Sequence, residues 1–382
     1  MHDSVPSAPD ERTASEALHA RARAFVEAFE AGAPSPESFD ALACDIARFQ
    51  ATGSVGFRRL CRARGVDPAS LSHADEIPPV PTDAFKLTRV ATFAEADAEV
   101  VFRTSGTTIG ARGEHAMRTV ETYDRAALAF GRRWLARDLD KRVPVLVLGP
   151  SPEELPDSSL VHMCATFART FGRRAEPEAT FLVADGVIDL ATFDERISRA
   201  VVEPVPVLVL GTSFAFVHFL DALGDEMTFV LPPGSRVMQT GGFKGKSREV
   251  PASELRRSLA KAFGIEERAI VSEYGMTELS SQFYERTLFE QGAKHGIYAE
   301  PPWARVVPVD PVTLAPVPEG EIGLAKILDL VNVDSAVAVL AQDRVRRVPG
   351  GFELLGRAPG APPRGCSIAI DELLGRGGGP EA

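Results

Sequence analysis

The stretch VPVLVLGTSFAFVHFL, residues 205–220, indicates the fold class. Its first half is a continuous apolar, β-branched run, and its second half carries apolar residues at helical spacing. Pro206, Gly211 and His218 interrupt it, and it is shorter than the ~20 apolar residues that a membrane span needs. We therefore interpret it as a buried strand followed by a helix.

Similar buried runs recur along the chain and are separated by helical patterns. The runs are PVLVLGP (144–150), ATFLVADG (179–186), TFVLP (228–232), RVMQTGG (236–242) and AIVSEYG (269–275). The expected helices span residues 14–31, 36–64 with a break near Gly53, 121–138, 159–172, 190–202, 213–224 and 252–264. Strands without in/out alternation, separated by helices, indicate a largely parallel sheet covered on both faces. Several runs end in glycine and a small polar residue, where an open α/β sheet binds its ligand.

The predicted organisation is one large α/β core and a smaller β-rich part, as expected for 382 residues. We expect a disordered N-terminus over 1–12 and an α/β core with a helical beginning over 13–302. The segments ARVVPVD, GEIGLAKILDL and AVAVLAQDRVRRV then predict a smaller, more antiparallel β-rich subdomain over 303–374. A flexible tail, 375–382, follows.

Composition excludes several classes of protein. The net charge is −11 and no long Lys/Arg run is present, so nucleic acid is not an expected partner. The four cysteines include no CxxC pair, and the acidic N-terminus lacks the apolar core of a signal peptide. The scattered histidines form no HxxxH or HExxH pair, and no GxSxG motif is present. We expect a reduced, cytoplasmic protein without a transmembrane segment.

A loop rich in glycine and hydroxyl residues, RTSGTTIGARG (103–113), follows a predicted strand. Glycines let the backbone approach a ligand, and N–H groups and hydroxyls donate to phosphate oxygens, with Arg112 as a cation. The fixed lysine of the GxxxxGK[ST] loop is missing. An ordinary strand-to-helix turn is the alternative.

A second motif, SEYGMTE (272–278), ends a predicted buried strand. Its aromatic ring can stack on a base, its threonine can donate to a phosphate, and its glutamate can hold Mg²⁺. EGEIG (319–323), Asp343 in AQDRV and Arg357 in LGRAPG follow. In this order the motifs resemble the adenylate-forming superfamily of acyl-CoA synthetases, adenylation domains and luciferases.

A narrower resemblance covers roughly residues 15–374. FRTSGTT, GARGEHAM, TGGFKGKSRE, SEYGMTELSSQFYE and LGRAPGAPPRGCSIAIDEL are similar to the acyl-protein synthetases of the bacterial luciferase system. Such proteins form acyl-AMP from a long-chain fatty acid and ATP, and carry the acyl group on a cysteine towards a reductase. The resemblance implies the adenylate-forming fold, ATP and Mg²⁺ as cofactors, a fatty acid substrate and an acyl-reductase partner.

The resemblance also implies a role for each matching residue. Thr104, Ser105, Gly106, Thr107 and Thr108 match the loop over the triphosphate, with Thr107 and Arg112 taking part in catalysis. Tyr274, followed by Gly275, matches the aromatic residue that stacks on adenine, and Gly241 and Gly242 match the backbone beside the adenine. Thr277 matches the phosphate donor, Glu278 the magnesium ligand, Asp343 the acid on the ribose, and Arg357 the arginine near ribose and phosphate.

This sequence departs from the superfamily pattern in two ways. Ile109 stands where a glycine is usual and Arg112 where a lysine is usual. The chain ends at Ala382 and its last lysine is Lys326, so we expect the C-terminal lid domain with its adenylation lysine to be absent or vestigial. Arg112, Lys244 and Lys246 are the candidates for the missing charge.

Cys366, in PPRGCSIAI, is the predicted acyl acceptor. A thioester needs an accessible thiolate, and the neighbouring Arg364 would lower the thiol pKa. The acyl-accepting cysteine of the family also lies close to the C-terminus. The alternative for Cys366 is a strand residue in the terminal β region. Cys44, Cys61 and Cys164 lie in helical patterns and are expected to be small buried residues.

Three points stay open from the sequence. The protein could instead be an acyl- or aryl-CoA ligase of the phenylacetate type, or a catalytically silent subunit that binds nucleotide or scaffolds a reductase. His115, in GEHAM, either contacts substrate or satisfies the loop backbone, and we favour the structural role. Phe214, Phe216 and Phe219 have the spacing of core residues, with a share in an acyl tunnel as the alternative hypothesis.

Overall fold

Four parallel strands form the half of the sheet that the sequence predicts best. The computed structural model describes residues 10–104, 112–173, 180–224, 228–241, 250–358 and 364–374, and of residues 364–368 the backbone only. The parallel strands are β4 (Val145–Leu148), β7 (Leu208–Thr212), β8 (Arg236–Thr240) and β9 (Ile270–Tyr274). Their side chains are almost all buried because helices cover both faces.

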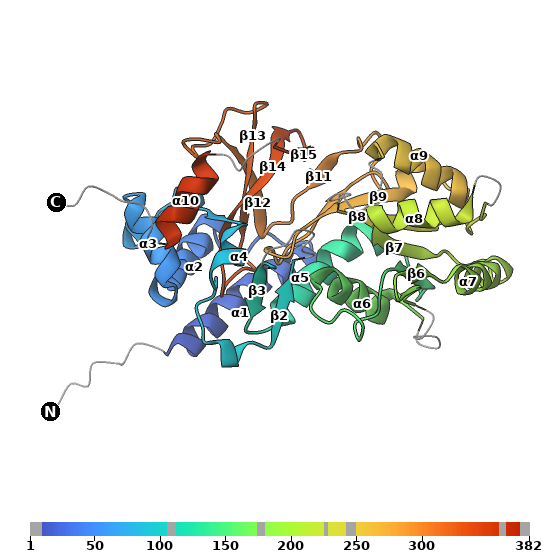
Figure 1. The fold of residues 1–382 in the computed structure, drawn as a ribbon, viewed down its shortest axis with the longest axis horizontal. Helices are drawn as coiled ribbons and strands as arrows, with labels where there is room; N and C mark the ends of the chain where they lie inside the picture. The colour runs from blue at the N-terminus through green and yellow to red at the C-terminus, as the bar shows by residue number, and fades with distance from the viewer. Residues whose placement is uncertain are drawn as a thin grey trace.

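Successive residues of these strands alternate between two hydrophobic clusters. Val145 and Val147 join the cluster on the side of α5 (Glu121–Gly131) and α6 (Ser159–Phe171). Leu146 and Leu148 join the cluster on the side of α7 (Leu190–Val202), α8 (Ser213–Leu223) and α9 (Ala252–Phe263). Figure 1 shows α8 and α9 above the strands and α6 below them.

The antiparallel half continues the same sheet. Its strands are β10 (Phe283–Glu285), β11 (Ile297–Ala299), β12 (Ala304–Val309), β13 (Ile322–Asp329), β14 (Ala338–Val348) and β15 (Gly351–Arg357). Within the described ranges the order is β12-β13-β14-β15-β11-β10-β9-β8-β7-β4, and β1 (Val80–Pro81) adds parallel to β14, which makes an eleven-stranded sheet. The mixed α/β fold class is confirmed, and the division of the chain near Trp303 stays a prediction.

The N-terminal helices pack beside the antiparallel half. They are α1 (Glu11–Glu30), α2 (Phe39–Gly53), α3 (Val55–Ala63) and the short α4 (Ala84–Leu87). Asp10 caps α1 by accepting from the backbone N–H of Thr13 at 2.8 Å, so helix begins within the segment that we expected to be disordered. The predicted break falls at Gly53, where a Cβ atom would lie 2.7 Å from Cβ of Thr92.

Two small sheets complete the described part of the chain. β2 (Val100–Arg103) and β3 (Glu114–Met117) flank the glycine-rich loop and pair with each other. β5 (Val183–Ala184) and β6 (Val187–Ile188) form a two-stranded hairpin where the sequence predicted a longer strand. None of the helices described is long and apolar enough to cross a membrane.

One local prediction was wrong, and so was the alternative interpretation of Cys366 as a strand residue. Residues 228–232 do not form a strand, because the N–H groups of Phe229 and Leu231 bond to the carbonyls of Ala262 and Phe263 at the end of α9. The segment around Cys366 is helix α10 (Arg364–Leu374), not a strand. Figure 1 shows α10 beside α3.

An ion pair and a close contact are among the interactions that dock helix α10 on α3 and its C-cap residue. Arg64 and Glu372 are 2.6 Å apart and both side chains are largely shielded. A Cβ atom at Gly56 would lie 3.1 Å from the Leu373 side chain, so the glycine permits close approach. Helix α10, at the end of the described part of the chain, therefore packs against α3 near its beginning.

Candidate active site

Three of the residues predicted to bind the nucleotide lie together at one place on the sheet. The Tyr274 hydroxyl at the end of β9 donates to Oδ2 of Asp343 on β14 at 2.9 Å. Arg357 on β15 is the register partner of Asp343, and its Nε lies 3.7 Å from Oδ1 of that carboxylate. The Arg357 side chain is 70% exposed, so its guanidinium is free to meet a ligand. The fold thus assembles residues from three separate motifs.

Tyr274 is held by other aromatic rings. The rings of Phe283, Tyr298 and Phe352 lie about it with centroid distances of 6.0, 6.1 and 5.9 Å. Burial, and the neighbouring Asp343 carboxylate, raise the pKa of Tyr274 well above its ordinary value, so the phenol remains a hydrogen-bond donor. Because Tyr274 is only 8% exposed, it can offer a ligand only a small part of its ring.

The end of β8 forms the neighbouring side of this site. Gly241 has φ of 70°, a left-handed conformation that favours glycine, and its carbonyl accepts from Oγ of Ser213 at 2.8 Å. No atom lies within 4 Å of the place where its Cβ would be. Gly242, Lys244 and Lys246 lie outside the described residues.

A buried carboxyl group precedes Tyr274. Glu273 accepts a hydrogen bond from Oγ1 of Thr240, its register partner on β8. Burial raises the pKa of Glu273 to about 7, and the Thr240 hydrogen bond opposes the shift. A Cβ atom at Gly275 would lie 2.5 Å from Oε1 of Glu273, so the glycine leaves room for this carboxyl group.

The glycine-rich loop is closed at its base by Thr104 and Arg112. Thr104 and Gly113 exchange two hydrogen bonds of 2.9 Å, one to the Thr104 hydroxyl. Arg112 donates through Nε to the Thr104 carbonyl at 2.7 Å and pairs with Asp157, also at 2.7 Å. The guanidinium therefore braces the loop, and contact with a phosphate stays a prediction. Ser105, Gly106, Thr107 and Thr108 lie outside the described residues.

Side chains distant in the sequence bond to the main chain of Thr277 and Glu278, which follow β9. The carbonyl of Thr277 bonds to Nδ1 of His115 at 2.7 Å. The carbonyl of Glu278 accepts from Nδ2 of Asn332 at 3.0 Å. His115 thus joins the strand after the glycine-rich loop to the YGMTE segment. This contact fits the structural role favoured from the sequence, and that role stays a prediction.

The described part of the chain offers no ready-made metal cage. Nowhere in it do three or more His, Cys, Asp or Glu side chains gather as metal ligands. Glu278 is 7% exposed and is the carboxylate that the sequence predicts for Mg²⁺. Mg²⁺ typically takes only one or two protein carboxylates and fills its shell with water and phosphate oxygens.

The cysteines differ in their surroundings. Cys44, Cys61 and Cys164 are buried, as expected. Burial raises the pKa of each thiol, in the case of Cys61 to about 11, which makes a thiolate unfavourable. Cys366 falls in the first turn of α10, and its side chain lies outside the described residues.

Lys326, the last lysine of the chain, and two of the phenylalanines of residues 213–224 lie in the interior. Lys326 is buried on β13 and donates to the Asp75 carbonyl at 2.8 Å, and burial lowers its pKa to about 8. Phe216 and Phe219 are fully buried in the cluster that α7, α8 and α9 share, which supports the core interpretation.

The sequence analysis did not identify several residues that support the candidate site. Asp157, Thr240 and the turn 331–335 carry no motif, because their partners are distant in the chain. The only local signal is the polar run NVDS (332–335) within an otherwise apolar stretch.

Solved structures share this fold. A 2-hydroxyisobutyryl-CoA ligase in an open conformation, in complex with 2-HIB-AMP and CoA, aligns with a TM-score of 0.58 at 14% identity. The alignment covers 83% of this chain and 74% of that chain. A postadenylation form of the same ligase also gives 0.58. At this identity the likeness concerns the fold alone.

Sequence comparisons identify the family. Two proteins described as long-chain-fatty-acid–luciferin-component ligase are similar to this chain, one from Vibrio harveyi and one from Aliivibrio fischeri. They are 21% and 23% identical to it, over 83% of this chain and 83% and 84% of their own lengths. The family model described as acyl-protein synthetase, LuxE, matches residues 44–375. This chain is therefore a member of the LuxE acyl-protein synthetase family.

Proposed function

We propose that this protein uses ATP to activate a long-chain fatty acid as acyl-AMP and then passes the acyl group to Cys366, from which a reductase partner takes it. The observation that carries the proposal is the meeting of Tyr274, Asp343 and Arg357 at one place. Family membership and the substrates named for the two relatives support the same chemistry.

The first step joins a carboxylate to the α-phosphorus of ATP. A carboxylate oxygen forms the new P–O bond, the bond to the bridging oxygen of the β-phosphate breaks, and pyrophosphate leaves. Such a step needs alignment and charge neutralisation more than a general base. Asp343 would accept hydrogen bonds from ribose hydroxyls, and Arg357 would face the ribose and the α-phosphate.

The glycine-rich loop would hold the triphosphate. Thr104 and Arg112 close its base, and hydroxyls and N–H groups of residues 105–108 would donate to phosphate oxygens. Thr277 would donate to the α-phosphate. Glu278 would hold Mg²⁺, which supplies neutralisation of phosphate charge when it is bound.

The second step transfers the acyl group to a thiol. The thiolate attacks the acyl carbonyl carbon, a C–S bond forms, and AMP leaves with the electrons of the mixed anhydride. Burial disfavours the thiolates of Cys44, Cys61 and Cys164, which supports Cys366 as the acceptor.

Labelled pyrophosphate tests the first step, because reversible adenylation returns it to ATP only when a suitable acid is present. We expect exchange with long-chain fatty acids and Mg²⁺, and a large loss in Asp343→Ala. Release of a free CoA thioester would favour a CoA ligase instead. Failure of every acid to support exchange would favour a catalytically silent subunit.

A further inference from the structure

His115 lies at a junction between two parts of the candidate site. It belongs to β3, the strand that follows the glycine-rich loop, and its register partner on β2 is Phe102. Its side chain is 2% exposed, and its ring packs edge-on against Phe85 with a centroid distance of 5.7 Å. A histidine buried to this degree either stabilises its surroundings or positions a neighbouring segment of the chain.

The hydrogen bonds of His115 have a fixed direction. Burial lowers the pKa of His115 to about 4, although the Thr277 carbonyl opposes the shift, so the ring is neutral at pH 7. Nδ1 lies 2.7 Å from the Thr277 carbonyl oxygen, which can only accept, so Nδ1 carries the proton. Nε2 then accepts from the Ser335 hydroxyl at 2.8 Å. The chain of donors runs from Ser335 through His115 to Thr277.

The same turn, residues 331–335, holds the next residue of the YGMTE segment. Asn332 donates through Nδ2 to the Glu278 carbonyl and to the Ala336 carbonyl, both at 3.0 Å. Its Oδ1 accepts from the Ser280 hydroxyl at 2.6 Å. Side chains from elsewhere in the chain therefore fix the carbonyls of two consecutive residues that have predicted catalytic roles.

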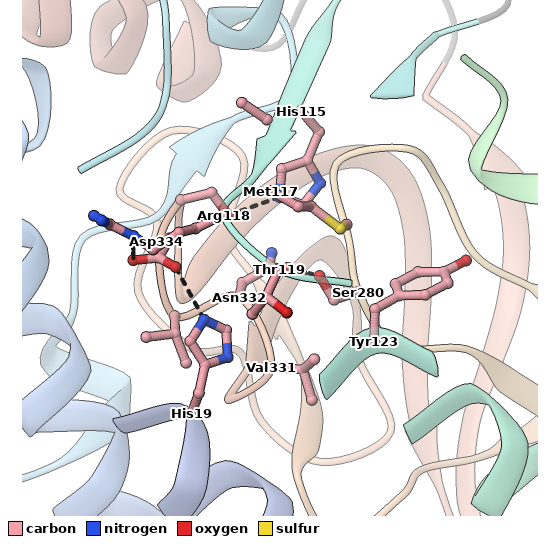
Figure 2. Close-up of a pocket in the computed structure, with 13 residues that line it drawn as sticks. His19, His115, Met117, Arg118, Thr119, Tyr123, Ser280, Val331, Asn332 and Asp334 are labelled. Atoms are coloured by element: carbon pink, nitrogen blue, oxygen red, sulfur yellow. Dashed lines mark hydrogen bonds and ion pairs between the residues drawn. The ribbon is translucent and has the colours of Figure 1, made fainter. Parts of the chain in front are cut away.

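The turn itself is anchored by Asp334. Its carboxylate accepts from Ser15 at 2.8 Å and from Thr92 at 3.2 Å, and it lies 2.9 Å from Nε2 of His19 on α1. Figure 2 shows His19 and His115 on opposite sides of a cavity, with Asp334, Asn332 and Ser280 around it. The cavity is about 20 Å³, room for a single water molecule.

We propose that His115 is a positioning residue that fixes the main chain of Thr277, next to the Glu278 carbonyl that Asn332 holds, relative to β3 and the base of the glycine-rich loop. The proposal rests on the proposed function for its catalytic consequence only. Phosphoryl chemistry without a general base depends on alignment, and a displacement of about 1 Å can cost roughly 10²-fold in rate.

Three variants separate this role from a merely structural one. His115→Ala removes the donor to Thr277. His115→Asn keeps an amide N–H close to the position of Nδ1 and restores that bond. His162→Asn is the matched control, because His162 also bonds to a neighbour, Asp124 at 2.7 Å, but this bond belongs to α6 and not to the YGMTE segment.

Two measurements test the effect of these variants, and the first does not depend on enzyme activity. Hydrogen exchange of the peptide 275–281 is expected to accelerate at least tenfold in His115→Ala and to stay near wild type in His115→Asn and His162→Asn. In ATP–pyrophosphate exchange, His115→Ala should lose about 10²-fold in kcat with a smaller change in the KM for ATP. His115→Asn should recover most of that loss.

The proposal is overturned if His115→Ala leaves the exchange of 275–281 unchanged, or if His115→Asn is as impaired as His115→Ala in that measurement. It is also overturned if backbone exchange rises while kcat stays at the wild-type value. If the wild type supports no pyrophosphate exchange with any fatty acid, the proposed function fails. The hydrogen-exchange comparison then still decides whether His115 holds the main chain at Thr277.

Discussion

The Tyr274 hydroxyl donates a hydrogen bond of 2.9 Å to Oδ2 of Asp343, although the two residues are 69 positions apart in the chain. This bond joins the last residue of a parallel strand to the antiparallel half of the sheet. It leaves Oδ1 of Asp343 facing Arg357. The candidate nucleotide site therefore depends on the boundary between the parallel and antiparallel halves of the sheet.

We predict that Tyr274→Phe weakens ATP binding without unfolding the protein. The ring and its aromatic neighbours remain, but Asp343 loses the donor that orients it. Hydrogen bonds to charged groups contribute about 1.5–3 kcal/mol, so the KM for ATP should rise roughly 10-fold or more. Pyrophosphate exchange as a function of ATP concentration measures this. An unchanged KM would show that the bond does not organise the site.

Arg112→Lys is predicted not to be conservative. A lysine cannot bond at once to the Thr104 carbonyl and to both oxygens of Asp157, as the guanidinium does. The kcat of pyrophosphate exchange should fall, whereas the free energy of unfolding should change by less than about 1 kcal/mol because the ion pair is partly exposed.

Asp157→Asn tests the same Arg112–Asp157 ion pair by changing its acidic partner. Its effect on kcat should resemble that of Arg112→Lys, and the double variant should be little worse than either alone, since both changes break one interaction. Full additivity of the two losses would indicate that Arg112 acts on substrate independently of Asp157.

Glu273→Gln should change how stability depends on pH. The pKa of Glu273 is about 7 in the folded protein against an ordinary value of 4.5, so the folded state keeps a proton that the unfolded chain loses between these values. Stability from this group therefore falls as pH rises from 4.5 to 7, by about 3 kcal/mol at most. Relative to wild type, Glu273→Gln should gain stability between pH 5 and pH 8 in urea unfolding.

Glu285 provides a control of opposite sign. Burial alone would raise its pKa, but His295, Arg256 and two backbone N–H groups outweigh burial and lower it. Its contribution is present above pH 4.5 and is lost as pH falls further, so Glu285→Gln should destabilise the protein at pH 7 and less so in acid. The same pH trend in both glutamine variants would contradict these assignments.

The sequence predicted the periodic elements well. Helix α7 has the predicted bounds 190–202, and all four parallel strands lie within predicted apolar runs. Periodicity succeeds here because both faces of the sheet are buried. It fails at residues 228–232, where an apolar run bonds to the end of α9 and leaves Val230 72% exposed.

Contacts between residues distant in the chain account for the features that the sequence did not predict. The segment around Cys366 forms a helix because Leu373 and Glu372 find partners on α3, which lies some 300 residues earlier in the chain. The bond from His115 to Thr277 spans 162 positions, and no local motif marks it. Motif order predicted that Tyr274, Asp343 and Arg357 share a site, but the residues that brace the site are visible only in the folded chain.

Labelled long-chain fatty acid tests the central claim most directly. With ATP and Mg²⁺, the wild-type protein should acquire label that hydroxylamine removes, and Cys366→Ala should lose this label while it retains pyrophosphate exchange. Cys61→Ala should label as wild type does, because Cys61 is buried. Full labelling of Cys366→Ala, or a wild type that takes up no label in the presence of ATP, would contradict the account.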